Sequence, residues 1–242
     1  MTARRDLVHH HDGDTLRPLM LAPECDVAAG TVLLVHDAFG VGGFSLSVAE
    51  QLVALGYVVF AADLWGERRT PHTDEEVGPL IGAMVGDRER WISRARAAYE
   101  LALDQPEVDA GRVAALGHCF GGATVLELVR SGAELRGAVA VHAGLNLLDP
   151  AAAWAPAATA GVLVCTGAED PLATPAQWRA LRENLDTAGI PWELDLYSGA
   201  VHAFTNPALA ASPRPEVAAY EPRAARRSWE STVRFLEEVL AP

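Results

Sequence analysis

The sequence has few cysteines and no histidine pattern suited to a metal ion. Its three cysteines, Cys25, Cys119 and Cys165, are widely separated and odd in number, so we expect neither a disulfide framework nor a zinc knuckle. Residues 9–11 are consecutive histidines, but neighbouring side chains on a strand point to opposite faces, which argues against a shared metal ion. We expect a protein that needs no metal and no cofactor.

Membrane and export signals are also missing from the sequence. No stretch approaches the roughly 18 apolar residues of a membrane-spanning helix. The first ten residues, MTARRDLVHH, carry two arginines without an apolar run behind them. We therefore expect no signal peptide, no membrane association and a place in the reducing cytoplasm.

Basic residues are scarce relative to acidic ones. The chain has 19 Lys and Arg against 32 Asp and Glu, a formal net charge of −13 and a sequence pI of about 5.0. Such a surface repels phosphate backbones and anionic lipid, which disfavours nucleic acid and membranes as partners. Its 242 residues, 50% of them hydrophobic, suffice for one large core. We expect a single domain over residues 1–242, monomeric or homodimeric, that acts on a small molecule.

Apolar runs of strand length alternate with longer amphipathic or alanine-rich segments. The sequence predicts strands at 31–35, 57–62, 112–116, 137–142, 162–166 and 192–197. It predicts helices at 44–55, 88–103, 120–130, 175–188 and 226–240. This alternation indicates an α/β fold with a mostly parallel sheet and helices on both faces. The segment before residue 31 is expected to hold one antiparallel hairpin turning at residues 12–13, and residues 151–160 and 209–222 to form surface segments.

The most informative segment is LGHCFGG, residues 116–122, between a predicted strand and a predicted helix. This is the G-x-nucleophile-x-G pattern, with Cys119 in the position of the nucleophile. The flanking glycines permit a tight turn that holds Cys119 in a strained conformation, and the helix dipole favours its thiolate. The alternative is a small buried cysteine in a glycine-rich turn. Cys25 and Cys165 lack this context and are expected to be inert.

Acid and base candidates follow the nucleophile in the chain order typical of this fold. Asp170 comes after the strand at 162–166, and His202 lies in the loop after the last strand. His202 would take the thiol proton while Asp170 holds its tautomer. Glu169 is a competing acid and His142 a competing base. His118 precedes the nucleophile, and we expect it to point away.

The loop after the first parallel strand reads HDAFGVGG from residue 36. On this type of fold, the loop lends a backbone N–H to the oxyanion hole, so Ala38 and Phe120 are the expected donors. Asp37 places a carboxylate near Cys119, which disfavours the thiolate and opposes the helix dipole. Alternatively, Asp37 caps the following turn.

These residues resemble the dienelactone hydrolase family of α/β-hydrolases, from residue 36 to the closing helix. The resemblance rests on the segments HDAFGVGG, ADLWG, GHCFGG, GAEDPL and AVHAFTNP. It implies the α/β-hydrolase fold and a triad of Cys119, His202 and Asp170.

Two positions depart from the family pattern. A family glutamate that gates the nucleophile corresponds to Asp37, which is shorter by a methylene. An arginine that grips the substrate carboxylate corresponds to Asn206, whose amide cannot form a bidentate clamp. Phe39 and Asn206 are the expected substrate-binding residues. Arg68, Arg69 and Arg88 could supply charge instead, but we expect them to be solvated or paired with Glu67, Asp87 and Glu89.

The sequence thus predicts hydrolysis of a small ester or lactone through a thioester on Cys119. Two other hypotheses are a thiol-based, peroxide-responsive protein and a non-catalytic binding scaffold. The first is disfavoured because no resolving cysteine is evident near Cys119, and the second because all three triad positions are filled.

Overall fold

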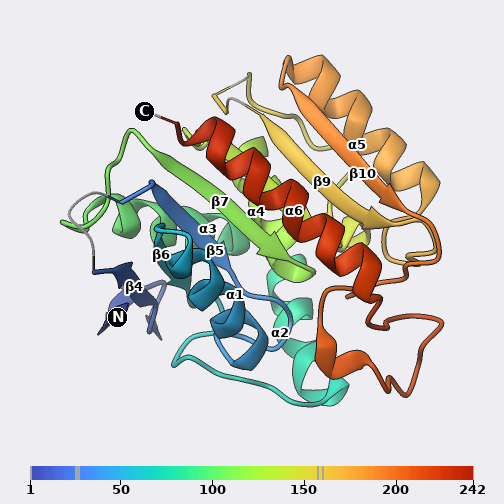
Figure 1. The fold of residues 1–242 in the computed structure, drawn as a ribbon, viewed down its shortest axis with the longest axis horizontal. Helices are drawn as coiled ribbons and strands as arrows, with labels where there is room; N and C mark the ends of the chain where they lie inside the picture. The colour runs from blue at the N-terminus through green and yellow to red at the C-terminus, as the bar shows by residue number, and fades with distance from the viewer. Residues whose placement is uncertain (1, 25–27, 157, 160, 242) are drawn as a thin grey trace.

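An eight-stranded sheet runs through the molecule (Figure 1). The computed structural model describes residues 2–24, 28–156, 158–159 and 161–241. The strand order is β1-β4-β6-β5-β7-β8-β9-β10, and a separate small sheet pairs β2 with β3. The strands are β1 Thr2–Asp6, β2 His9–His11, β3 Asp14–Leu16, β4 Leu19–Pro23, β5 Thr31–Val35, β6 Val58–Ala62, β7 Val113–His118, β8 Gly137–Val141, β9 Val162–Gly167 and β10 Trp192–Tyr197. The helices are α1 Gly43–Ala54, α2 Asp74–Gly86, α3 Arg88–Leu103, α4 Phe120–Arg130, α5 Pro175–Ala188 and α6 Pro222–Val239, with short 3-10 turns η1 Leu145–Leu147 and η2 Pro207–Leu209.

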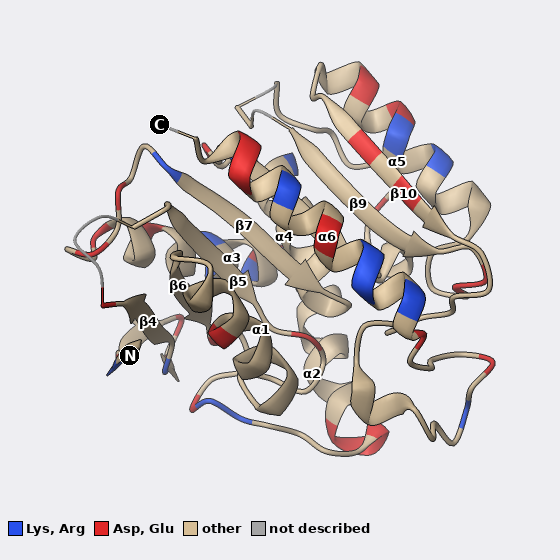
Figure 2. Cartoon of the chain, viewed as in Figure 1, with Lys and Arg blue, Asp and Glu red and all other residues tan. Residues whose placement is uncertain are grey.

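The parallel core of the sheet follows the sequence prediction closely. From β6 to β10, neighbouring strands are parallel, with registers such as Val35 opposite Gly117. Side chains alternate between two apolar layers. One layer joins α3, α4 and α5 to one face of the sheet, and the other joins α1 and α6 to the opposite face. Figure 1 shows α1 and α6 crossing in front of the strands, and Figure 2 shows charged residues along α5 and α6. The predicted α/β class is confirmed.

The N-terminal segment forms more structure than a single hairpin. The hairpin of β2 and β3 turns at Asp12 and Gly13, as expected. In addition, β1 and β4 form an antiparallel pair, and β4 joins the edge of the main sheet beside β6. The sequence of β1 gave no strand signal because all five of its residues are exposed. Backbone pairing with β4 holds it in place, together with side-chain contacts of Arg5 to Glu107 and of Asp6 to Arg68.

Helix α2 was not predicted from the sequence. Its start carries a capping box in which Thr73 and Glu76 exchange side-chain and backbone hydrogen bonds. Glycines and Pro79 within the helix obscured this signal, because both residue types are unfavourable in a helix interior. The last helix, predicted from residue 226, begins a turn earlier at Pro222, where Glu221 caps it through the N–H groups of residues 223 and 224.

The chain reverses its direction of winding at β5. The connection from β5 through α1 leads to β6 on one side, and the next connection crosses back over β5 to reach β7 on the other. A sheet of this kind has a crevice at the carboxyl ends of the two strands that flank the reversal. Among the residues described, no helix is long and apolar enough to cross a membrane.

Candidate active site

Five side chains able to act as an acid, a base or a nucleophile follow five parallel strands at one edge of the sheet. Asp37 comes after β5, Cys119 after β7, His142 after β8, Asp170 after β9 and His202 after β10. The carboxyl ends of parallel strands lie at the same edge, so connections far apart in sequence meet there.

The turn that carries Cys119 is sharply constrained. Cys119 has φ 54° and ψ −114°, a conformation that is costly for a residue with a side chain. A Cβ on Gly121 would lie 2.2 Å from the carbonyl oxygen of Val35, and one on Gly117 would lie 2.1 Å from that of Gly121. Glycine is therefore required on both sides of the cysteine. The predicted strand–turn–helix geometry is present around Cys119.

The sequence predicts two backbone N–H groups as oxyanion donors, those of Phe120 and Ala38. Phe120 is the first residue of α4, and its N–H has no intrahelical acceptor. The carbonyl oxygen of Ala38 accepts a hydrogen bond of 3.1 Å from the Trp65 indole, which fixes the peptide of this loop. Within the described parts of the chain, the N–H groups of Ala38 and Phe120 donate to no other group. The Cys119 side chain is half-buried.

His202 and Asp170 form a buried pair. His202 Nδ1 lies 2.9 Å from Asp170 Oδ2, and both side chains are almost fully buried. The other carboxylate oxygen of Asp170 accepts the N–H of Leu172. The competing acid, Glu169, instead accepts the N–H of Gly199 in an exposed position. Asp170 is therefore hydrogen-bonded to His202, whereas Glu169 bonds to Gly199.

The electrostatics of His202 favour its protonated form. Burial lowers the pKa of His202, but the negative charge of Cys119 and the hydrogen bond to Asp170 outweigh burial and raise the pKa to about 10. Nε2 of His202 is buried and has no hydrogen-bond partner among the residues that the structure describes. A thiolate and an imidazolium at this position would stabilise each other.

The Asp37 side chain caps its own turn, and the charge of His202 acts on the pKa of its carboxyl group. Its Oδ1 accepts the N–H of Phe39 at 2.9 Å. Burial raises the pKa of Asp37 to about 6, while the Phe39 N–H and the charge of His202 act in the opposite direction. The turn cap expected as one interpretation of Asp37 is thus present, whereas an action of its carboxylate on the Cys119 thiol stays a prediction.

His36 has a role that sequence reasoning missed. Its ring connects the loop after β5 to the segment after β6, with Nε2 accepting the N–H of Leu64 and Nδ1 lying 2.6 Å from the carbonyl oxygen of Asp37. The ring also packs against Trp65 and Phe120. The signal available in the sequence was a polar residue at the end of an otherwise apolar strand.

The remaining histidines at this edge form a row beside His202. His142 has φ 36°, packs edge-on against His202 at 5.3 Å between ring centroids, and bonds to Thr205 Oγ1 at 2.8 Å. His118 packs against His142. Burial lowers the pKa of His142 well below its usual value and that of His118 to about 3. Both rings are neutral neighbours, and in the described part of the chain His142 has no carboxylate partner such as His202 has.

The loop of His202 is held by a distant segment. His202 N–H donates to the carbonyl oxygen of Val217, and the His202 carbonyl accepts from Ala219, in a short parallel bridge. This segment belongs to residues 209–222, which the sequence predicted only as a surface excursion. It positions the backbone of the histidine.

The expected substrate-binding residues differ in exposure and in the hydrogen bonds that they already make. Phe39, in the loop after β5, is 36% exposed. Asn206 is buried, and its side-chain oxygen accepts the N–H of Ala208 at the start of η2. Arg88 is engaged by the buried Glu127 at 2.7 Å and by the carbonyl oxygen of Leu147.

The other cysteines lie away from this arrangement. Cys165 is buried inside β9, and burial raises the pKa of its thiol to about 12. Cys25 lies outside the described residues. Within the described ranges, no group of three or more metal-ligating side chains could hold a metal ion.

Comparisons with known families settle the relationship suggested by the motifs. The model of the dienelactone hydrolase family matches residues 18–240. The chain belongs to the dienelactone hydrolase family. The resemblance drawn from the sequence is thereby confirmed, and this member of the dienelactone hydrolase family is an α/β-hydrolase and a hydrolytic enzyme.

Solved structures agree with this relationship. A dienelactone hydrolase-like promiscuous phosphotriesterase from metagenomic libraries is 30% identical over 98% of each chain, with a TM-score of 0.87. A protein named m3DLH is 34% identical over 98% of each chain, with a TM-score of 0.86. The Pyrobaculum calidifontis esterase, at 18% identity, covers 99% of this chain and 86% of its own with a TM-score of 0.68, and shows the fold alone. No curated protein matches the sequence.

Proposed function

We propose that the chain hydrolyses a small carboxylic ester or lactone, with Cys119 as nucleophile, His202 as proton-transfer group and Asp170 as its orienting partner. The observation that carries this proposal is the 2.9 Å contact of His202 Nδ1 with Asp170, because it leaves Nε2 for the cysteine. Membership of the dienelactone hydrolase family supports hydrolysis as the reaction class.

The reaction begins with transfer of the thiol proton from Cys119 to His202 and attack of the sulfur on the carbonyl carbon. The N–H groups of Phe120 and Ala38 stabilise the oxyanion of the tetrahedral intermediate. The bond to the leaving oxygen then breaks, and the His202 imidazolium protonates that oxygen, giving an alcohol and a thioester. Water, deprotonated by His202, attacks the thioester and releases the acid. Cys119 and His202 return to their initial state.

The substrate is proposed to be uncharged near the reacting carbonyl. Asn206 cannot form a bidentate pair with a carboxylate, and its oxygen is already used at the start of η2. Arg88 is held by Glu127. These contacts favour simple esters and lactones over a substrate that carries a carboxylate.

Hydrolysis of 4-nitrophenyl acetate by wild type, Cys119→Ala and Cys165→Ala tests the proposal. Cys119→Ala should lower kcat/KM by roughly 10³-fold or more, as loss of a covalent nucleophile does. Cys165→Ala is the matched control, because that thiol is buried in β9, and it should keep wild-type activity. Hydrolysis by Cys119→Ala at the wild-type level would refute the proposal.

Mass spectrometry separates this proposal from a redox role. After brief exposure to the ester, an acetyl group should be found on Cys119 and on no other residue. Under the peroxide-responsive alternative, peroxide would give a sulfenic acid on Cys119 while the ester would leave no adduct.

Phosphotriester hydrolysis is a second candidate function. The relative that is 30% identical over nearly the whole chain is described as a promiscuous phosphotriesterase. The same thiol and oxyanion donors could act on a phosphoryl centre, with the phosphoryl oxygen in place of the carbonyl oxygen. Turnover of paraoxon that is lost in Cys119→Ala would support this activity, and stoichiometric release of one 4-nitrophenol per chain would show inhibition instead.

A further inference from the structure

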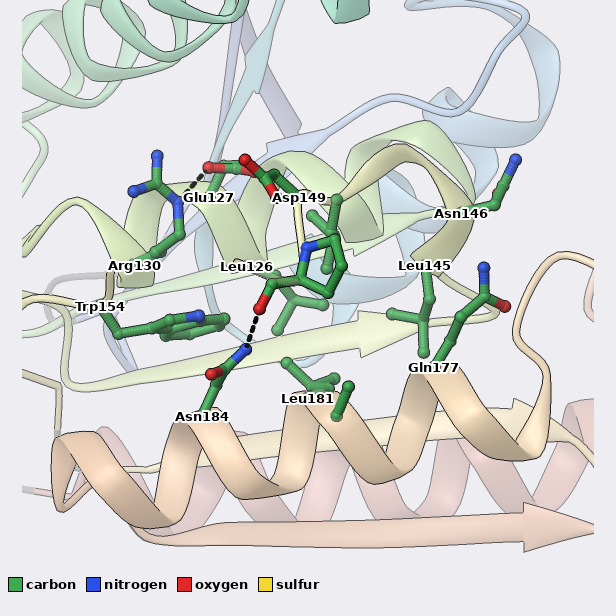
Figure 3. Close-up of a pocket in the computed structure, with 13 residues that line it drawn as sticks. Leu126, Glu127, Arg130, Leu145, Asn146, Asp149, Trp154, Gln177, Leu181 and Asn184 are labelled. Carbon is green, nitrogen blue, oxygen red and sulfur yellow. Dashed lines mark hydrogen bonds and ion pairs between the residues drawn. The ribbon is translucent and has the colours of Figure 1, made fainter. Parts of the chain in front are cut away.

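Two cavities lie apart from the proposed triad, and they differ in how their polar side chains are paired. The first lies between α4 and α5, beside Trp154 (Figure 3). Glu127 is paired there with Arg130. The amide of Asn184 donates to the carbonyl oxygen of Pro150. Groups that already bond to each other gain little from a ligand, so no ligand class follows from these contacts.

The second cavity opens between α1 and α6, where Figure 1 shows the carboxyl end of β7 between the two helices. Its volume is about 270 Å³. Phe44 of α1 and Trp229 of α6 supply aromatic rings to its sides, and Leu116 of β7 and Val141 of β8 supply apolar surface from the sheet. Sites for drug-sized ligands have volumes of roughly 300–1,000 Å³, so this cavity suits a ligand of about one ring.

His118, the residue before Cys119, lines this cavity and is 6% exposed. Its ring packs edge to face with that of Phe44, at 5.0 Å between centroids. Within the described residues, neither ring nitrogen of His118 makes a hydrogen bond, whereas His142 and His202 each make one. The unpartnered nitrogens of those two histidines are sealed from solvent, but the nitrogens of His118 are not. A ligand in the cavity can therefore reach a polar group that has lost most of its contact with water.

The electrostatics of the cavity favour an uncharged ligand. Burial lowers the pKa of His118 to about 3, so near neutral pH the ring has one N–H donor and one unprotonated nitrogen. Among the described residues that line the cavity, only Arg226 is charged, and its exposed side chain lies 3.6 Å from that of Glu230. A hydroxyl group suits a neutral imidazole in either tautomer, because it accepts from the N–H and donates to the unprotonated nitrogen.

We propose that this cavity binds a small uncharged phenol, with its ring between Phe44 and Trp229 and its hydroxyl group on His118. Aromatic rings pack favourably against one another in offset or edge-to-face arrangements. The hydroxyl group supplies the partner that the His118 ring lacks within the protein. No residue of the proposed triad lines the cavity, so the inference does not depend on the reaction proposed for Cys119.

Titration of wild type with phenol tests the inference, with toluene as the matched probe in which a methyl group replaces the hydroxyl. The readout is the pair of His118 ring ¹⁵N resonances, assigned by their loss in His118→Phe. Phenol should shift these resonances saturably, with a dissociation constant on the order of 1 mM for so small a ligand. Toluene should bind roughly threefold or more weakly, since it cannot make the hydrogen bond. A purely apolar cavity would instead prefer toluene, and toluene binding as tight as that of phenol would overturn the role of His118.

Two α1 variants locate the binding site. Ser47 and Glu50 are both exposed, but only Ser47 lines the cavity. Ser47→Phe should fill the cavity and abolish phenol binding, and Glu50→Phe should leave it unchanged. Cys119→Ala should also bind phenol normally, which separates this site from the proposed catalytic one. Binding that survives in Ser47→Phe, or the absence of a saturable shift in wild type, would overturn the inference.

A measurement on wild type guards against misfolding of the variants. Intermolecular nuclear Overhauser effects should connect the phenol ring to the rings of Phe44 and Trp229 and to the methyl groups of Val48, which all line the cavity. Contacts to Phe39 alone would place the probe at the catalytic edge and would contradict the proposal.

Discussion

The backbone N–H of Leu64 donates to Nε2 of His36 at 3.1 Å, deep inside the molecule. Since Nε2 accepts, the ring proton must lie on Nδ1, which donates to the carbonyl oxygen of Asp37 at 2.6 Å. Burial lowers the pKa of His36, which preserves this neutral tautomer. The loop that supplies the Ala38 N–H is therefore fixed by a histidine outside the proposed triad.

Replacing His36 by phenylalanine should destabilise the fold and reduce turnover. The change leaves the Leu64 N–H and the Asp37 carbonyl unpaired, at about 1–3 kcal/mol each, so unfolding free energy should fall by about 2–6 kcal/mol. Urea denaturation measures this loss. The exposed His72 provides the control, since His72→Phe should change stability by less than about 0.5 kcal/mol. Equal stabilities of the two variants would contradict the assigned role of His36.

Removing the thiol should lower the pKa of His202. Cys119 is the largest of the contributions that raise it to about 10, so Cys119→Ala should shift titration of the ring toward lower pH. In wild type the ring should stay protonated above pH 8, and Nδ1 and Nε2 chemical shifts from ¹⁵N NMR report this directly. Cys165→Ala should titrate as wild type. An unchanged titration in Cys119→Ala would show that the two side chains do not interact.

Asp37→Asn should remove a pH-dependent part of the stability. The pKa of Asp37 is raised by burial from 3.8 to about 6, so the folded state holds more protons than the unfolded state between these values. Stability contributed by this group is then greatest below pH 4 and falls as pH rises to about 6, by roughly 3 kcal/mol in total. Asparagine retains the acceptor for Phe39 and cannot ionise. The stability of Asp37→Asn relative to wild type should therefore increase as the pH rises from about 4 to about 6.

Urea denaturation at pH 4 to 7 measures this effect, with Asp109→Asn as control. Asp109 makes the same side-chain contact to the N–H two residues ahead, at 3.0 Å to Gly111, but is exposed. Asp109→Asn therefore reports the effect of the same substitution in the same local contact without burial. A constant difference for Asp37→Asn would refute the raised pKa.

Gly121→Ala should disrupt the nucleophile turn, whereas Gly78→Ala should stabilise the protein. A Cβ at Gly121 would lie 2.2 and 2.5 Å from the carbonyl oxygens of Val35 and His36, and backbone at the end of β5 cannot yield. At Gly78 in α2 nothing lies within 4 Å, so alanine should add about 0.5–1 kcal/mol through helix propensity. Melting temperatures of both variants test the pair. A folded Gly121→Ala with wild-type activity would contradict the packing described.

Sequence patterns predicted the parallel strands and their helices well because these signals are local. Apolar runs such as β5 and β7 and the stop at Gly189 need only neighbouring residues to be recognised. By contrast, β1 carries no apolar pattern, and the capping signal of α2 competes with glycines and Pro79 in the same segment. Both elements owe their stability to partners elsewhere in the chain.

The sequence alone determined the order of the candidate nucleophile, acid and base, because turn sterics and strand–helix alternation restrict where such residues can stand. It also identified the glycine-bounded turn at Cys119. Only the tertiary structure decided that His36 secures the first loop, that Val217 and Ala219 hold the backbone of His202, and that a pocket forms beside Trp154. These features depend on contacts between residues far apart along the chain, and such distances are set by packing and not by local pattern.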